Sequence, residues 1–285
     1  FNIISGIQFG LPICVQPMKA IATIAISEGL SVNQILATGI ILGVVTLVLG
    51  MTGLITVLAR FVPKSIVRGI QVGIGLKLIM EGISMVEKTG VWFGLDSYLT
   101  GIVCGLFILT FFLYQRVPAA LIIFLAGIIV ATVQAPNVLH QLHLQVYIPH
   151  IVHLSSIDFI DGGLKAGLPQ VPLTLLNSII ALCALSRELF PDKPIKEKDI
   201  SISVGIMNIV GCWMGGMPSC HGSGGLSGQY AYGARTGGSM IMLGSAKMLI
   251  AVFLGMTVWP LFVAFPKSIL GALLFFSGME LVILI

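Results

Sequence analysis

The sequence has few charged residues. Asp, Glu, Lys and Arg together make up 9% of the chain, whereas hydrophobic residues make up 56%. An average soluble domain carries about 25% charged residues, so this deficit excludes an ordinary soluble domain. Together with a mean hydropathy of +1.05, the composition indicates a multi-pass integral membrane protein, placed in the plasma membrane or in the membrane of an intracellular organelle.

Several functional signatures are also missing. The five cysteines are scattered through apolar segments, so no disulfide framework can be read. The basic residues form no continuous stripe, which argues against a nucleic-acid partner. GSGG at 222–225 lacks the Lys-Ser/Thr pair of a phosphate-binding loop. No nucleophile, base and orienting group recur near one another, and no cofactor motif is present, so we expect neither an enzyme nor a bound cofactor.

Apolar runs of helical length recur along the chain, and strand-like alternation is mostly absent. Many of these runs approach the roughly 20 residues that cross a bilayer, so the sequence predicts an all-α polytopic membrane protein. The predicted spans and half-spans cover residues 1–11, 12–29, 34–58, 66–85, 98–114, 118–133, 168–186, 200–215, 220–235, 239–259 and 267–285. In 12–29 and again in 168–186, two prolines are expected to precede the helix. We expect residues 134–166 to form a non-cytoplasmic loop with interfacial segments. The chain begins without Met and ends without a polar tail, so we expect a fragment.

One span is interrupted by a stretch that breaks helices. Residues 217–235, MPSCHGSGGLSGQYAYGAR, are rich in glycine and small hydroxyl residues and include Pro218. In a membrane such a stretch predicts a helix broken at mid-depth, whose free backbone N–H groups can meet a polar ligand.

The broken span has a second copy near the start of the chain. At an offset of 206, residues 1–20 match residues 207–226, and at an offset of 203, residues 63–79 match residues 266–282. The coincident pairs include Asn2/Asn208, Pro12/Pro218, Cys14/Cys220, Gly75/Gly278 and the shared Pro-Lys-Ser-Ile. We predict a first repeat over 1–134, a connecting segment over 135–167 and a second repeat over 168–285. An odd number of spans separates the copies, so they are predicted to be inverted in the membrane.

Inverted copies of a broken helix bring two helix N-termini together, and their partial positive charges suit an anion. Each terminus contributes about 0.3–2 kcal/mol, less than the cost of removing water from an oxyanion, so further donors must take part. Neither break holds an acid before Glu28, which argues against a cation site or a proton-coupled base. The predicted substrate-binding residues are Val15, Gln16, Lys19, Thr174, Asn177, Ser219, Cys220, His221, Gly222, Ser223 and Gln229.

Structural roles compete with these assignments. The glycines of 211–238 could serve close helix packing, and Lys19 could reach the membrane interface or neutralise Glu28. Cys212, Cys220 and His221 lack a fourth ligand and the spacing of a zinc site, so no metal is predicted. Arg235 fits a topological anchor better than a ligand.

Three stretches carry a resemblance to a known family. VQPMKAIA at 15–22, LPQVPLTLLNS at 168–178 and MPSCHGSGGLSGQYAYGARTGG at 217–238 resemble signature stretches of the eukaryotic molybdate transporter family, a branch of the sulfate permease superfamily. The resemblance implies two inverted seven-span repeats with core and gate domains, of which this chain covers about spans 2 to 12. It implies a secondary transporter in a lipid bilayer that binds molybdate between the two breaks and works by alternating access, with a homodimer as one option.

Other functions stay open from the residues alone. A sulfate or general oxyanion permease would use the same donors. A nucleobase or ascorbate permease of the same fold is disfavoured by the missing acids at the second break. An anion channel is not excluded, because the sequence does not distinguish continuous conduction from alternating access.

Overall fold

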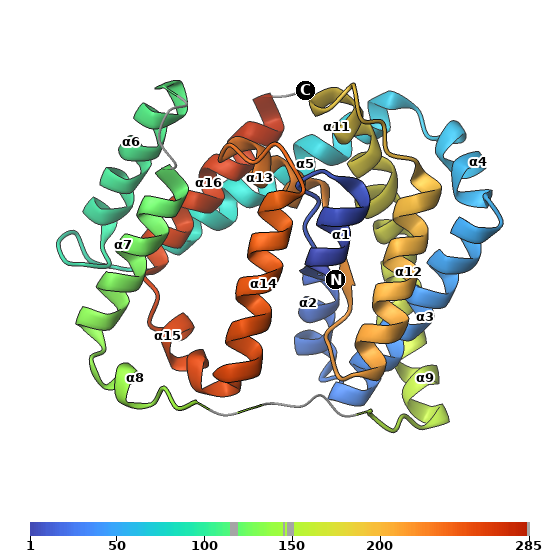
Figure 1. Ribbon diagram of the computed structural model, residues 1–285, viewed down its shortest axis with the longest axis horizontal. Coiled ribbons are helices and arrows are strands. Elements are labelled where there is room, and N and C mark those ends of the chain that lie inside the picture. Colours follow the sequence, from blue (N-terminus) through green and yellow to red (C-terminus); the bar gives the residue numbers. More distant parts are fainter. Residues whose placement is uncertain (115–118, 145, 147–150, 284–285) are drawn as a thin grey trace.

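Helices make up nearly all of the protein in the computed structural model, which describes residues 1–114, 119–144, 146 and 151–283 (Figure 1). The elements in chain order are α1 (Asn2–Phe9), β1 (Gln16–Pro17), α2 (Lys19–Glu28), α3 (Val32–Met51), α4 (Leu54–Phe61), α5 (Lys64–Glu87), α6 (Tyr98–Tyr114), α7 (Ala119–Gln134), α8 (Asn137–His140), α9 (Ser156–Gly162), η1 (Gly163–Gly167), α10 (Leu168–Leu173), η2 (Thr174–Ala181), α11 (Leu182–Leu189), α12 (Glu197–Trp213), β2 (Ser219–Cys220), α13 (Ser223–Ala231), α14 (Gly238–Phe253), η3 (Gly255–Val258), α15 (Trp259–Val263) and α16 (Lys267–Ile283).

Several of these helices suit a bilayer. Among the described residues, Val32–Met51 and the continuous helix Ser156–Leu189 are long and apolar enough to cross one, and the pair Gly238–Phe253 and Gly255–Val263 makes a third if it is counted as one span. Shorter apolar helices lie at Tyr98–Thr110, Leu121–Gln134 and Lys267–Met279. Many large apolar side chains on these helices are exposed, as expected for surfaces that face lipid.

Two predicted spans are shorter than expected because glycines end them. The predicted span 34–58 is divided into α3 and α4, and Gly53 takes a φ of +75° between them. The predicted span 239–259 ends at Phe253, beyond which the chain turns by 113° at Gly255. Residues that carry a side chain rarely adopt a positive φ, whereas glycine does so readily, so Gly53 and Gly255 permit these two turns.

The prediction of a loop over the whole of 134–166 is wrong at its C-terminal end. A helix begins at Ser156, where the Ser155 hydroxyl accepts from the Asp158 N–H and the Asp158 carboxylate accepts from the Ser155 N–H. This capping box starts a helix that continues to Leu189. The two prolines that were expected to precede the helix lie inside it, and π-helical turns at η1 and η2 accompany them.

The helices are arranged around a central group. In Figure 1, α6, α7 and α16 lie toward one end of the molecule and α3, α4 and α12 toward the other, with α1, α2, α13 and α14 between them. Helix α3 packs along α12, α1 packs against α14, and α5 packs along α16. The helices that directly precede the breaks, α1 and α12, therefore pack against helices that follow the other break, and the equivalent helices α5 and α16 pack on each other, as expected for an internal inverted repeat.

Helices α5 and α16 cross at glycines. A Cβ atom added at Gly278 would lie 2.5 Å from the Gly75 carbonyl oxygen, and one added at Gly75 would lie 2.8 Å from the Gly278 oxygen. Gly82 and Gly271 meet in the same reciprocal way at the other end of the contact. Because lipid gives no hydrophobic drive between helices, close backbone approach of this kind supplies much of their association.

Replacing Gly278 with alanine should therefore destabilise the protein by about 1–3 kcal/mol through overpacking against the α5 backbone. The matched control is Gly73→Ala in α5, where an added Cβ has no heavy atom within 4 Å and the better helix propensity of alanine should be neutral or slightly stabilising. Thermal unfolding of the two variants in detergent measures the difference. Equal melting temperatures would show that the crossing tolerates a methyl group.

Candidate functional site

The two predicted breaks lie against each other. Strands β1 and β2 pair in antiparallel fashion, with Gln16 opposite Cys220 and Pro17 opposite Ser219, and the Met18 N–H donates to the Pro218 carbonyl at 2.8 Å. Each strand leads into a short helix, β1 into α2 and β2 into α13, and the two helices leave the crossing on opposite sides (Figure 1). The prediction of two broken helices that begin near one point is confirmed.

Two asparagines at equivalent repeat positions hold the crossing. The Val15 N–H donates to Asn2 Oδ1 at 2.7 Å and Asn2 Nδ2 donates to the Val15 carbonyl at 3.3 Å. Asn208 does the same for Ser219, at 2.9 Å and 2.7 Å. Each amide side chain thus pairs with both the N–H and the carbonyl of one residue, as a neighbouring strand would, and satisfies these partly buried backbone groups. The sequence comparison paired these asparagines but assigned them no role.

The N-termini of both half-helices are free of side-chain caps. Their N-cap residues, Met18 and Gly222, have extended backbones and make no capping hydrogen bond. The Gly225 N–H of α13 donates to the Gly222 carbonyl at 3.0 Å, so the N–H groups that precede it and the positive ends of the two helix dipoles are the features that could meet a ligand.

Glycines let the two breaks approach. An added Cβ at Gly222 would collide with Gln16 Nε2, and one at Gly225 would collide with Cys14 Sγ. The first break therefore rests directly on the backbone of the second. These glycines therefore do serve close packing, as considered from the sequence. Their packing brings the side chains of Cys14 and Gln16 against the start of α13.

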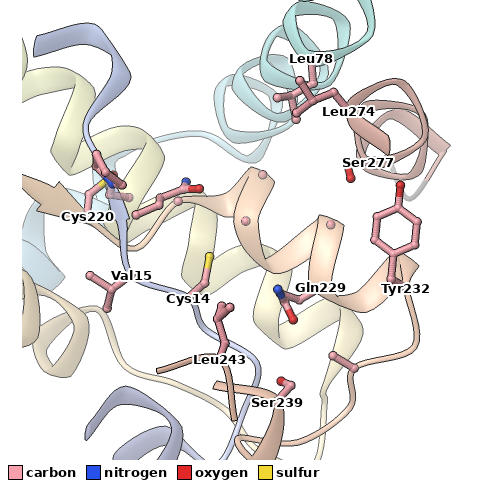
Figure 2. Close-up of a pocket in the computed structure, with 18 of the residues that line it drawn as sticks. Cys14, Val15, Leu78, Cys220, Gln229, Tyr232, Ser239, Leu243, Leu274 and Ser277 are labelled. Atoms are coloured by element: carbon pink, nitrogen blue, oxygen red, sulfur yellow. The ribbon is translucent and has the colours of Figure 1, made fainter. Parts of the chain in front are cut away.

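A cavity of about 990 Å³ opens beside the crossing. Figure 2 shows Cys14, Val15 and Cys220 from the two breaks on one side of it and Leu78, Leu274 and Ser277 from α5 and α16 on the other. Gln229 and Tyr232 project from the end of α13 or just beyond it, and Ser239 and Leu243 from α14. The cavity thus lies between the half-helices and the helices α5, α7 and α16.

The predicted residues divide into two groups. Those that line the cavity are Val15, Gln16, Asn177, Cys220, Gly222 and Gln229. Thr174, Ser219, His221 and Ser223 are not among its lining residues. The side chain of Lys19 lies outside the part of the chain that the structure describes.

The second group supports the first. His221 is fully buried, and its Nδ1 donates to the Cys14 carbonyl at 3.1 Å while the Ser203 hydroxyl lies 2.9 Å from its Nε2. A carbonyl only accepts, so the ring carries its proton on Nδ1. The Ser223 hydroxyl donates to Asn177 Oδ1 at 2.8 Å. Both residues are polar and lie at the second break, but they join structural elements rather than face the cavity.

Sequence reasoning missed several cavity residues. They are Gln170, Ser178, Tyr232, Ser239 and Ser277, and the charged residues Lys77, Glu81 and Lys247. Gln170 is 4% exposed and its Nε2 donates to Thr174 Oγ1 at 3.0 Å, whereas its Oε1 has no partner among the described residues. It lies within the stretch LPQVPLTLLNS, so that motif was the signal that could have identified it.

The fold and the cavity define a helical membrane protein in which two half-helices begin at one crossing. The fold is similar to the transmembrane domain of the cyanobacterial bicarbonate transporter BicA, with a TM-score of 0.59, 13% identity and coverage of 96% of this chain and 76% of that chain. It is also similar to SLC26A9, with a TM-score of 0.60, 16% identity and coverage of 99% and 52%. At these identities the likeness establishes the fold alone.

The sequence comparisons establish the family. The family model described as molybdate transporter of MFS superfamily matches residues 1–78 and 162–281. Molybdate transporters 1 and 2 of Arabidopsis thaliana are 37% and 36% identical, each over 99% of this chain and 70% of the relative. Molybdate transporter 1 of Chlamydomonas reinhardtii is 29% identical over 99% of this chain and 76% of its own length. The chain therefore belongs to the molybdate transporter family, and the resemblance of its motifs is confirmed.

The asparagine at the second break can be tested directly. Asn208 is 1% exposed, and Asn208→Ala removes its two hydrogen bonds to the partly buried Ser219 N–H and carbonyl, at about 0.5–1.5 kcal/mol for each bond. The melting temperature in detergent should fall by several degrees. Asn137→Ala, at an exposed position on α8, should leave it unchanged, and an equal effect of both changes would contradict the role of Asn208.

Proposed function

We propose that this protein is a secondary transporter that carries molybdate across a membrane. The observation that carries the proposal is that two uncapped helix N-termini, those of α2 and α13, begin at one crossing beside a cavity. Backbone N–H groups and positive helix ends favour an oxyanion over a cation. The names of the similar molybdate transporters favour molybdate among oxyanions.

In this proposal, uncharged side-chain amides bind the oxyanion together with the two helix ends. Gln16 lines the cavity between the two half-helices. Asn177 accepts from Ser223 through Oδ1, which leaves its Nδ2 group as a donor for the cavity. An amide flip of Gln170 would likewise turn its unpaired atom into a donor, since oxygen and nitrogen are assigned from the hydrogen bonds.

The proposed binding set follows from the geometry. Val15, Gln16, Asn177, Cys220, Gly222 and Gln229 contact the substrate, and Thr174, Ser219, His221 and Ser223 hold these residues in place. Contact between Lys19 and the substrate stays a prediction, and so does a homodimer. We place the start of the second repeat at Ser156 rather than at residue 168, because one helix runs through that boundary.

Alternating access would move the half-helices against α5, α7 and α16. Apolar packing and hydrogen bonds join these groups: Tyr232 packs against the cluster around Phe276 and its hydroxyl donates to the Leu273 carbonyl at 2.6 Å, and the Ser227 hydroxyl reaches the Ser277 carbonyl at 3.5 Å. Each such bond is worth about 0.5–1.5 kcal/mol. A rigid displacement of the crossing, with its paired strands kept intact, would break them and expose the cavity to the other side of the membrane.

Calorimetric titration of the purified protein with molybdate tests the site. We expect saturable binding that uracil does not displace and that Gln16→Ala weakens about tenfold, since one charge-assisted hydrogen bond contributes about 1.5–3 kcal/mol. Gln141→Ala, at an exposed position outside the cavity, is the matched control and should bind like the wild type. Equal binding of sulfate would reduce the proposal to a general oxyanion permease, and displacement by uracil would favour a nucleobase permease.

Flux measurements in liposomes separate a transporter from an anion channel. Alternating access predicts that molybdate uptake saturates and that molybdate inside the vesicles accelerates uptake of labelled molybdate, because the loaded site returns faster than the empty one. Tyr232→Phe should alter this exchange rate by up to about fivefold while changing binding little, since it removes a bond between the moving groups. Flux that rises linearly with concentration and shows no exchange would point to a channel.

A further inference from the structure

Two lysines line the same cavity as the half-helix ends. Lys77 belongs to α5 and Lys247 to α14. We propose that they are the counter-charges of the substrate site, and that they make it prefer doubly charged tetrahedral oxyanions over singly charged ones of the same shape. This inference rests on the proposed oxyanion site and specifies which substrate charge that site accepts.

The lysines come from opposite walls. Lys77 immediately precedes Leu78, and Lys247 lies one helical turn beyond Leu243. Figure 2 shows Leu78 on the side of α5 and α16, and Leu243 on the opposite side of the cavity. A doubly charged anion bound between the two lysines would therefore face Lys247 from the side of α14 and Lys77 from the side of α5.

Their position on apolar helices needs a reason. A charged side chain in a membrane segment is costly unless it faces water, a cavity or an opposite charge. Among the residues that the structure describes, the ion pairs join Arg68 to Glu188 and Arg187 to Glu197, so neither lysine takes part in one. Both line the cavity instead. Glu81, one turn beyond Lys77, is the only carboxylate among the described lining residues, so the lysines outnumber it.

Charge balance explains why the helix ends alone do not suffice. Each helix N-terminus acts as about half an elementary charge, so α2 and α13 together offer about one positive charge. This one positive charge is enough to balance a singly charged oxyanion such as perrhenate. Molybdate carries two negative charges near neutral pH, so its second charge needs side-chain cations. The two lysines exceed the single carboxylate by one charge and supply that difference.

The test compares molybdate with perrhenate, which is also tetrahedral but carries one negative charge. Dissociation constants of both anions are measured by calorimetry on the wild type, Lys77→Gln and Lys247→Gln. We expect each substitution to weaken molybdate at least about tenfold and perrhenate less than about threefold, because the lost charge acts on the charge of the ligand. Lys247→Arg, which keeps the charge, should restore the wild-type ratio of the two affinities.

The matched control is Lys165→Gln. Lys165 is exposed on the apolar helix Ser156–Leu189 but is not a cavity residue, so the ratio should not change. Equal losses of molybdate and perrhenate in the Lys77 and Lys247 variants would mean a purely structural role, and no loss of either would mean that these charges do not act on the site. Both results would overturn this inference and leave the oxyanion site standing. A wild type that binds neither anion would instead overturn the proposed function.

Discussion

The rest of the structure depends on the backbone pairing of Gln16–Pro17 with Ser219–Cys220. Two chain breaks inside a membrane protein would leave many N–H and carbonyl groups without partners, and lipid offers none. The antiparallel pairing satisfies some of these groups, and the side-chain amides of Asn2 and Asn208 satisfy others. The half-helix ends that follow these extended segments have no side-chain caps, and the proposed oxyanion site is built on them.

Close packing holds the crossing together, and a second group of packed side chains lies apart from it. The α3–α12 contact and the crossing itself are built on glycines, for example Gly43 against Gly205 and Gly225 against Cys14. A large buried cluster, which includes Leu11, Ile21 and Leu226, joins both half-helices to α11 and α12. A separate cluster around Ile108, Ile123 and Phe276 belongs to α6, α7 and α16. The cavity is lined from one side by residues of the two breaks and from the other by residues of α5, α7 and α16.

Much of the fold could be predicted because its signals are local. Glycine and proline disfavour a regular helix, so residues 217–235 were identified as a break, and matching residues at nearly one offset identified its copy in residues 1–20. The errors arose where tertiary packing changes the effect of such residues. The prolines of 168–172 were expected before a helix, but π-helical turns carry the helix through them. Gly53 and Gly255 were read as parts of spans, but they turn the chain.

The sequence by itself determined that this is a membrane protein of the molybdate transporter family, with two broken helices that are copies of each other. Composition, helix-breaking residues and motifs suffice for that, since each is a property of short segments. Only the tertiary structure decided which polar side chains face the cavity. His221 and Ser223 bond to Cys14, Ser203 and Asn177 instead, whereas Lys77 and Lys247, far from either break in the sequence, line it. A side chain's direction depends on how distant helices pack around it, and no local pattern records that.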